Sequence, residues 1–429
     1  MDSPCPSNPT SQSEESLSPR QSRVTGALLA LHAGDSLGAT VEFRTHSQIR
    51  SRYPQGIRDI IGGGTFDWPA GHATDDTDMT RAVVLAYKSL HDCKSETQAL
   101  SDDTDVARLA GEKFLAWLDG DWPDPDRKLG VLPKDIGNAT ARGLDKYRKS
   151  RDPDNAGAGH GSAGNGSLMR CLPTGLFQPD LESITTESIR ISRITHNDFR
   201  CTTACAVYNH IVAALIEGAS ADYAVRAGKA VAARIEKRRD GEVYCAVQRG
   251  TELRVVDMAK SGPPPDMKGN CGGYVLESLT VAVAAVLDSR CLEDVIVDVI
   301  RIGRDTDTNA AIAGGLLGAR DGEAAIPKRW REKLQFGGRG QTGYMAGPAT
   351  PPKSRTRPPN PTTTTNTIMV KRRSIKAQER DFRLSEAILG IQTGKYKSAN
   401  AAAIALGLRP DTWIKDLTTS GYAPSHLQL

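Results

Sequence analysis

The sequence predicts an all-α protein, and two observations carry this prediction. Apolar residues recur three and four positions apart in six Ala-rich stretches: residues 26–37, 80–90, 106–118, 189–217, 274–287 and 310–319. This spacing places the apolar side chains on one face of a helix. Aromatic residues make up only 5% of the 429 residues, whereas alanine and glycine are abundant, which favours closely packed helices over a β-sandwich.

The stretches between these helices carry weaker patterns. Residues 57–64 hold a short apolar run that ends in three glycines and fits either a small strand or a loop. Residues 234–270 look like a charged, Pro-rich insertion, in which 242–248 and 252–256 are expected to pair as a hairpin.

Charge and composition divide the chain into parts. Residues 351–429 contain 13 Lys and Arg against 5 Asp and Glu, a net charge of +8, so the rest carries about −4 of the total of +4. We expect a disordered Ser- and Pro-rich lead at 1–22, one helical domain at 23–347 and a Pro/Thr-rich linker at 348–370. A small module at 371–418 and a tail at 419–429 follow.

The cysteines and the apolar runs bear on the cellular compartment. None of the eight cysteines forms a CxxC pair, and Cys201 and Cys205 lie one helical turn apart, a spacing typical of core packing. No run approaches the roughly 20 apolar residues of a membrane span, and the lead lacks the apolar core of a signal peptide. We therefore expect free thiols, a cytoplasmic or nuclear location and no membrane partner.

Two Asp-rich clusters are the strongest functional signal. Their members are Thr74, Asp75, Asp76, Thr77 and Asp78 in the first and Asp305, Thr306, Asp307 and Thr308 in the second. Residues one or two apart do not share a helix face, so each cluster is expected in a loop or at a helix start. Carboxylate and hydroxyl oxygens suit Mg²⁺, although Asp and Thr also cap helices without any metal. The repetition of the pattern about 230 residues apart favours two halves of one binuclear site.

These clusters belong to a series of five motifs. The motifs are Gly34-Asp35-Ser36-Leu37-Gly38-Ala39, Thr74-Asp75-Asp76-Thr77, Gly164-Asn165-Gly166-Ser167-Leu168-Met169-Arg170, Thr195-His196 and Arg304-Asp305-Thr306-Asp307-Thr308-Asn309-Ala310. In this order they resemble the motifs of the ADP-ribosylglycohydrolase family, which includes the dinitrogenase reductase-activating glycohydrolases. The resemblance covers about residues 22–335. It implies an all-α orthogonal helical bundle and two bound Mg²⁺ ions, with Mn²⁺ as the alternative.

The resemblance also implies roles for individual residues. The implied metal ligands are Thr74, Asp75, Asp76, Asp305, Asp307 and Thr308. The implied substrate-binding residues are Asn165, Gly166, Ser167, Met169, His196 and, from the weaker segment 273–275, Tyr274. Glu42 matches a glutamate that approaches the metals or the scissile bond in some members. One departure is Arg304, because the family usually has glycine at this position; its cation could pair with a phosphate or hinder backbone approach.

The implied reaction is hydrolysis of an N- or O-glycosidic bond to ADP-ribose, through an oxocarbenium-like state. Asp76 and Glu42 are the candidate bases, and Asp35 is a candidate supporting carboxylate. The Gly-rich loop 159–166 is expected to bring backbone N–H groups near the diphosphate. The substrate is expected to be an ADP-ribosylated protein or a small ADP-ribose conjugate, with the acceptor group left open.

Two residues keep two interpretations each. His196 either contacts the substrate or ends a helix as a structural residue, and Arg170 either binds phosphate or pairs within the core. Trp330 is expected to pack the last helix of the domain.

The C-terminal part suggests a separate module. Residues 377–392, 399–406 and 411–417 form three short helical patterns, separated by Gly394, Ser398, Gly407 and Pro410. This three-helix pattern is similar to the Pipsqueak-type helix-turn-helix of DNA-binding and fungal transposon-related proteins, and the basic run 371–373 would favour phosphate contacts. Two aspartates in the last helix oppose groove binding, so a module without DNA affinity is the alternative.

Two further functions therefore stand beside the hydrolase. The chain could act mainly by binding DNA through residues 371–418, with the large domain only recognising ADP-ribose. It could also be an inactive member of the family with a structural role.

Overall fold

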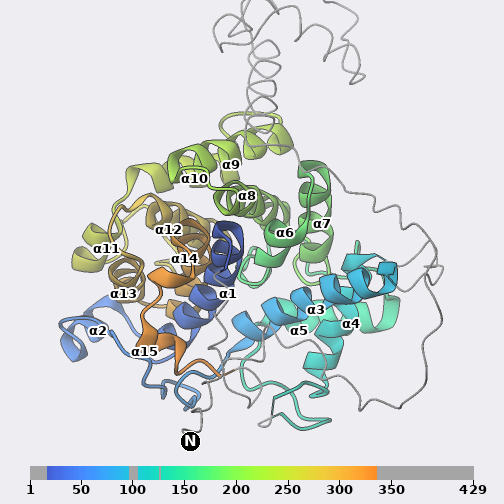
Figure 1. Cartoon of the computed structure of the whole chain (residues 1–429), viewed down its shortest axis with the longest axis horizontal. Helices are drawn as coiled ribbons and strands as arrows, with labels where there is room; N and C mark the ends of the chain where they lie inside the picture. Colours follow the sequence, from blue (N-terminus) through green and yellow to red (C-terminus); the bar gives the residue numbers. More distant parts are fainter. Residues whose placement is uncertain (1–16, 96–104, 125–126, 336–429) are drawn as a thin grey trace, which may run out of the picture.

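The computed structural model describes residues 17–95, 105–124 and 127–335, and this part of the chain is helical (Figure 1). The linker, the module at 371–418 and the tail lie outside the described residues. The helices are α1 (Pro19–Gly38), α2 (His46–Arg52), α3 (Asp75–Ser95), α4 (Val106–Leu118), α5 (Asn138–Ser150), α6 (Leu172–Phe177), α7 (Leu181–Arg193), α8 (Phe199–Ile216), α9 (Ala221–Glu236), α10 (Glu242–Glu252), α11 (Val255–Ser261), α12 (Val275–Leu287), α13 (Leu292–Ile302), α14 (Thr306–Asp321) and α15 (Lys328–Arg331). A short 3₁₀ helix, Glu323–Ala325, precedes α15. Isolated β-bridges occur, but these described stretches contain no strand, so the all-α prediction is confirmed.

Helices α1 and α14 form an antiparallel pair near the middle of the bundle (Figure 1). Glycines allow their backbones to touch. A Cβ on Gly34 would lie 2.2 Å from the Ala310 carbonyl oxygen, and one on Gly38 would lie 2.4 Å from the Asp307 Cα. Because real Cβ atoms do not come this close, no larger residue fits at either position. The pair therefore brings the C-terminal end of α1 against the first turn of α14, which carries the second Asp cluster.

Two apolar clusters pack against this central pair. One includes Leu31, Phe114, Tyr208 and Leu316, and joins α1 and α14 to the helices between α3 and α12. The other includes Leu37, Ile296, Leu317 and Trp330, and lies toward α2, α11, α13 and α15. Helix α12 also contributes to both clusters, so α1, α12 and α14 are buried from two sides. Trp330 is fully buried, as predicted.

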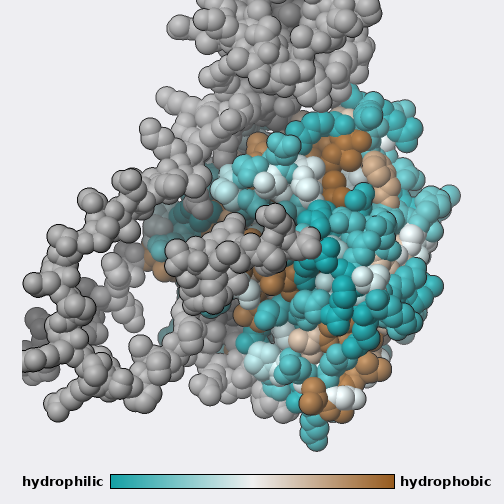
Figure 2. All heavy atoms as spheres, turned by 90° about the vertical axis from the view of Figure 1, so that its right-hand side faces the viewer, coloured by the Kyte–Doolittle hydropathy of each residue, from teal (hydrophilic) through white to brown (hydrophobic). Residues whose placement is uncertain are grey.

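One side of the described surface is mostly polar. In Figure 2, the described atoms on the side turned to the viewer are mostly hydrophilic, with small separate hydrophobic patches. Helix α8 is the one described helix long and apolar enough to cross a membrane, and 78% of that stretch is buried inside the protein.

Three local predictions were wrong or incomplete. Helix α1 begins at Pro19, inside the predicted disordered lead, because Ser18 and Gln21 form a capping box. The apolar pattern 189–217 is divided between α7 and α8, since Asp198 caps a new helix after the turn at 194–197. The hairpin expected in residues 234–270 does not form; helices α10 and α11 occupy this segment.

The short apolar runs explain the last error. Residues 242–252 bury Val243, Ala246, Val247 and Gly250, which lie three and four apart and face one side of a helix. A short apolar run such as 243–247 fits a strand or a helix, and only the longer window shows helical spacing. The run at 57–64 contains no strand, and only Gly63 bridges to Trp68.

Candidate metal centre

Both Asp clusters lie at helix starts, as their spacing predicts. Helix α3 begins at Asp75, and Asp305 precedes the first turn of α14. The carboxylate of Asp35 holds the start of α3 in place: its Oδ2 accepts hydrogen bonds from the backbone N–H groups of Thr74 (3.1 Å) and Thr77 (3.3 Å) and from the Thr77 hydroxyl. Asp35, on the neighbouring helix α1, therefore caps the N-terminus of α3, where the first cluster lies.

The two clusters meet although they are about 230 residues apart in sequence. The Thr308 hydroxyl donates a hydrogen bond to Asp76 Oδ2 over 3.2 Å, and the Thr74 hydroxyl approaches the same oxygen at 3.4 Å. The second oxygen, Asp76 Oδ1, is buried and has no hydrogen-bond partner. The geometry thus supports the prediction that the clusters form one site.

A backbone clamp brings Glu42 to the same place. Phe43 donates its N–H to the Arg304 carbonyl, and Arg304 donates its N–H to the Arg44 carbonyl, each over 2.7 Å. The clamp ties the loop after α1 to the residue before Asp305. Glu42 is buried, and its Oε2 has no hydrogen-bond partner.

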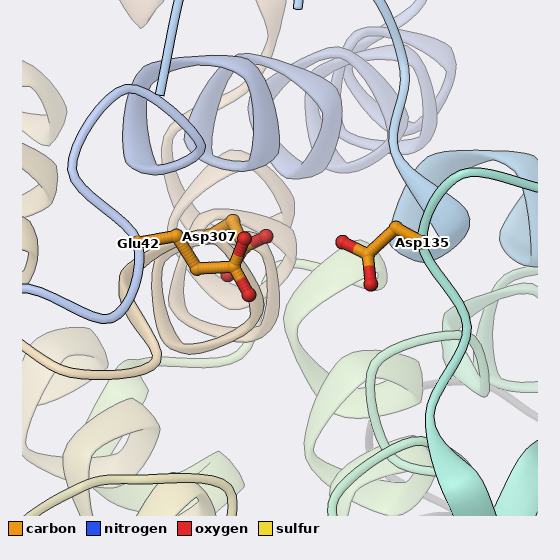
Figure 3. A group of neighbouring side chains, drawn as sticks. All are labelled: Glu42, Asp135 and Asp307. Atoms are coloured by element: carbon orange, nitrogen blue, oxygen red, sulfur yellow. The ribbon is translucent and has the colours of Figure 1, made fainter. Parts of the chain in front are cut away.

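Asp135 is a site residue that sequence reasoning missed. Figure 3 shows its carboxylate, on the loop before α5, directed toward Glu42 and Asp307. One carboxylate oxygen from each of these three residues lies within 4.8 Å of the other two. The only signal in the sequence is an aspartate shortly before a helix that starts at Asn138. A single carboxylate in that position is common, so the pattern does not distinguish it.

This crowding changes the acidity of the carboxylates. Burial, followed by repulsion from Asp135, Asp305 and Asp35, raises the pKa of Glu42 to about 9. Burial, followed by Asp35 and Asp305, raises the pKa of Asp135 to about 6. The pKa values of Asp75, Asp76 and Asp307 are also raised well above the usual range, first by burial and then by neighbouring carboxylates. Negative charge at this site is costly unless cations offset it.

The carboxylates line one wall of a cavity of about 730 Å³. Its lining residues are Glu42, Phe43, Phe66, Asp75, Asp135, Ile136, Gly137, Asn138, Ala139, Thr140, Gly164, Asn165, Gly166, Met169, His196, Gly269, Asn270, Gly272, Arg304, Asp305, Asp307 and Thr308. Asn165 lies beside the carboxylates, because its Nδ2 donates hydrogen bonds to Asp305 Oδ2 (2.8 Å) and to the buried Ser278 hydroxyl (3.0 Å).

A second wall of the cavity holds His196 through a chain of hydrogen bonds. The Arg170 guanidinium donates to the Thr195 hydroxyl over 2.7 Å, and Thr195 Oγ1 lies 2.8 Å from His196 Nδ1. Because the hydroxyl already accepts from arginine, its own proton is free to bond Nδ1, which leaves the hydrogen of a neutral imidazole on Nε2. Burial, followed by Arg170, lowers the pKa of His196 to about 3. His196 therefore offers a neutral N–H donor beside Gly164 and Gly166.

Arg170 itself belongs to the core. It is fully buried, donates to the Gly166 and Ile191 carbonyls, and lies over the Phe114 ring at 4.5 Å. Of its two interpretations, the structure supports the core role, with hydrogen bonds in place of an ion pair.

Two predicted substrate residues lie outside the cavity lining. Ser167 is buried and accepts a hydrogen bond from the Ser192 hydroxyl over 2.9 Å. Tyr274 precedes α12, and its ring lies 5.8 Å from the Arg200 guanidinium. Thr74, Asp76 and Asp35 are also absent from the lining, whereas Asn165, Gly166, Met169 and His196 belong to it.

Comparison with known proteins agrees with this geometry. The sequence profile described as ADP-ribosylglycohydrolase matches residues 16–347. An ADP-ribosyl-[dinitrogen reductase] glycohydrolase of Rhodospirillum rubrum is 30% identical over 73% of this chain and 90% of its own length. An ADP-ribosylarginine hydrolase of Pseudomonas putida is 27% identical, covering 75% of this chain and 76% of its own length.

A solved structure is also similar. It is described as an ADP-ribosylglycohydrolase-related protein complex and has a TM-score of 0.56 and 27% sequence identity, covering 75% of this chain and 95% of the other. The all-α fold, the convergent Asp clusters and the extent of the profile lead to one assignment. The chain belongs to the ADP-ribosylglycohydrolase family, which confirms the prediction of an enzyme of this class.

Proposed function

We propose that the protein is a divalent-metal-dependent hydrolase that cleaves the glycosidic bond of ADP-ribosylated substrates and releases ADP-ribose. The observation that carries this proposal is the convergence of both Asp clusters, Glu42 and Asp135 on one cavity wall. Members of this wall come from four separate segments of the chain, which a purely local role in helix capping does not require.

The residues present fit two Mg²⁺ or Mn²⁺ ions. The proposed ligands are Thr74, Asp75, Asp76, Asp305, Asp307 and Thr308, with Glu42 and Asp135 beside them. All are oxygen donors, the type that both ions prefer. Two buried oxygens, Asp76 Oδ1 and Glu42 Oε2, have no hydrogen-bond partner, as expected for atoms that await a cation. Bound divalent ions would neutralise the carboxylates and lower the pKa of a water molecule.

The chain's own side chains then supply orientation and proton transfer. Hydrolysis builds positive charge at the ribose anomeric carbon, which carboxylates on the wall stabilise. Glu42 and Asp76 are the proposed proton acceptors. Asp135 reaches the same space from the loop before α5, and we propose it as a further proton acceptor. Asp35 acts through the N-terminus of α3, so we assign it a positioning role.

The second wall is suited to the polar parts of the substrate. His196 offers its Nε2–H beside Gly164 and Gly166. This neutral donor matches a ribose hydroxyl or a phosphate oxygen. Two of the similar bacterial proteins are described as ADP-ribosylarginine hydrolases, and we therefore take ADP-ribosylated arginine in a protein as the first acceptor to test.

The decisive experiment replaces the second cluster. Asp305→Ala with Asp307→Ala is expected to abolish Mg²⁺-dependent release of ADP-ribose from ADP-ribosylated protein. Asp321→Ala, at the other end of α14, is the matched control and should keep full activity. Undiminished turnover by the double variant, with or without Mg²⁺, would rule out this function for the site.

DNA binding through residues 371–418 stays a prediction from the sequence, because that segment lies outside the described residues. Salt-dependent binding of the full chain to duplex DNA would support it, and no binding at low salt would count against it. The cytoplasmic or nuclear location is likewise a proposal.

A further inference from the structure

Arg304 is a single cation in an acidic cavity. Five carboxylate side chains line this cavity: those of Glu42, Asp75, Asp135, Asp305 and Asp307. Among the described lining residues, Arg304 is the only lysine or arginine. His196 does not add charge near neutral pH, because burial keeps its imidazole neutral. Apart from metal ions, an anionic ligand in this cavity meets one permanent positive charge.

The backbone holds Arg304 in place at the rim. Both of its peptide groups take part in the clamp with Phe43 and Arg44, so its main chain cannot move independently of the Glu42 loop. On the other side lies the loop of Gly272, where an added Cβ would contact the Arg304 Cβ at 3.9 Å. The side chain therefore leaves the backbone between two metal-site residues, Glu42 and Asp305.

Two features set this arginine apart from a structural one. Its φ of +70° lies in the left-handed region, where glycine is unstrained and a long side chain is disfavoured. Its side chain is exposed, and within residues 17–95, 105–124 and 127–335 no hydrogen bond or ion pair engages it. The backbone clamp holds this φ, whereas the guanidinium itself has no partner among the described residues and is available to a ligand.

We propose that Arg304 binds a phosphate group of the substrate. The inference rests on the proposed function, because an ADP-ribosyl conjugate carries a diphosphate into this cavity. A planar guanidinium can donate two parallel hydrogen bonds to phosphate oxygens. It also offsets repulsion between the phosphate and the carboxylates of the wall. The phosphate belongs either to the diphosphate of the ADP-ribosyl group or to an acceptor that is itself phosphorylated.

Binding and turnover of three ligands distinguish the two sources. The ligands are ADP-ribose, ADP-ribosylarginine and ADP-ribose 1″-phosphate, each measured with wild type, Arg304→Gln and Arg304→Gly. If Arg304 binds the diphosphate, both variants should bind all three roughly tenfold more weakly by calorimetry, in line with loss of one charged contact. If it binds an acceptor phosphate, only ADP-ribose 1″-phosphate should lose affinity, and ADP-ribosylarginine should bind as well or better.

Arg44→Gln is the matched control, since Arg44 is exposed in the same clamp but does not line the cavity. Arg304→Gly should melt at or above the wild-type temperature, because glycine relieves the backbone strain, so a loss of binding cannot be attributed to unfolding. Unchanged affinity for all three ligands in both Arg304 variants, or an equal loss in Arg44→Gln, would overturn the proposal. Wild type that binds ADP-ribose through Arg304 yet hydrolyses no conjugate would instead refute the proposed function and leave this inference standing.

Discussion

The two walls of the cavity differ in how their polar groups are satisfied. On the carboxylate wall, Asp76 and Glu42 each keep a buried oxygen without a partner, and burial followed by repulsion among neighbours raises their pKa values. On the second wall, Arg170, Thr195 and His196 form a connected chain of hydrogen bonds inside the protein, and only Arg170 Nε among their buried polar atoms has no partner. The first wall holds unpaired acidic oxygens, whereas the polar groups of the second are mostly satisfied within the protein.

This difference separates two kinds of contribution to activity. A wall with unsatisfied like charges lowers the stability of the metal-free protein, and it gains stability when a cation binds. A wall with satisfied hydrogen bonds adds stability by itself and offers preorganised donors to a ligand. Substitutions on the first wall should therefore lower activity without lowering the stability of the metal-free protein. Substitutions on the second wall should lower activity and stability together.

The largest effect is expected from Asp307→Asn. Because the variant loses a proposed ligand charge, kcat/KM for ADP-ribose release should fall by roughly a thousandfold or more. The same change should raise the stability of the metal-free protein by about 1 kcal/mol, since it removes a buried like charge while its amide oxygen can still accept the Thr308 N–H. Activity assays and chemical denaturation in EDTA measure the two effects. A less stable metal-free variant would contradict the comparison between the walls.

The next largest effect is expected from Arg170→Met, which should lower the free energy of unfolding. It removes a fully buried guanidinium with three hydrogen-bond acceptors and a ring contact, so unfolding should become easier by about 3 kcal/mol. Urea denaturation measures this loss, and Arg142→Met on the exposed side of α5 is the control. A loss below 1 kcal/mol would show that the hydrogen bonds of the second wall add little to the stability of the protein.

Metal removal should destabilise wild type by a comparable amount. At Mg²⁺ a hundredfold above its dissociation constant, linkage predicts about 2.7 kcal/mol of added stability. Asp307→Asn should lose most of this gain, whereas Arg170→Met should keep it. Thermal melting with Mg²⁺ and with EDTA tests the difference, and equal gains in both variants would place the metal elsewhere.

The pH dependence should have opposite signs on the two walls, with slopes of at most about 1.4 kcal/mol per pH unit for each group. Glu42 has a raised pKa of about 9, so the metal-free protein should lose stability as pH rises from about 4.5 toward 9. His196 has a lowered pKa of about 3, so stability should fall as pH drops below about 6.5.

Matched variants separate these two contributions. Glu42→Gln should flatten the alkaline side of the stability profile, and His196→Gln should flatten the acidic side. Denaturation in EDTA from pH 4 to 9 records both profiles. If Glu42→Gln flattened the acidic side of the profile, or His196→Gln the alkaline side, the direction of the pKa shift assigned to that residue would be wrong.

Much of the site was predictable because its signals are local. The clusters at 74–78 and 305–308 are dense in oxygen donors, and adjacent carboxylates have to lie where the backbone turns. Asp135 escaped prediction because a lone aspartate before a helix is common. The boundary between α7 and α8 was missed for a related reason: apolar spacing continues across the turn, and only the Asp198 cap marks a new helix.

The sequence by itself determined the helical class and the two helix starts that carry carboxylates, and its five ordered motifs resemble those of the family. The helical class and the helix starts follow from spacing and composition, which act over a few residues. Only the tertiary structure decided which residues share the cavity, because that depends on the close contact of α1 with α14 and on the clamp between Phe43 and Arg304. It also decided that Arg170 belongs to the core and that Arg304 lines the cavity. Both are arginines in site motifs, and burial and backbone geometry alone separate their roles.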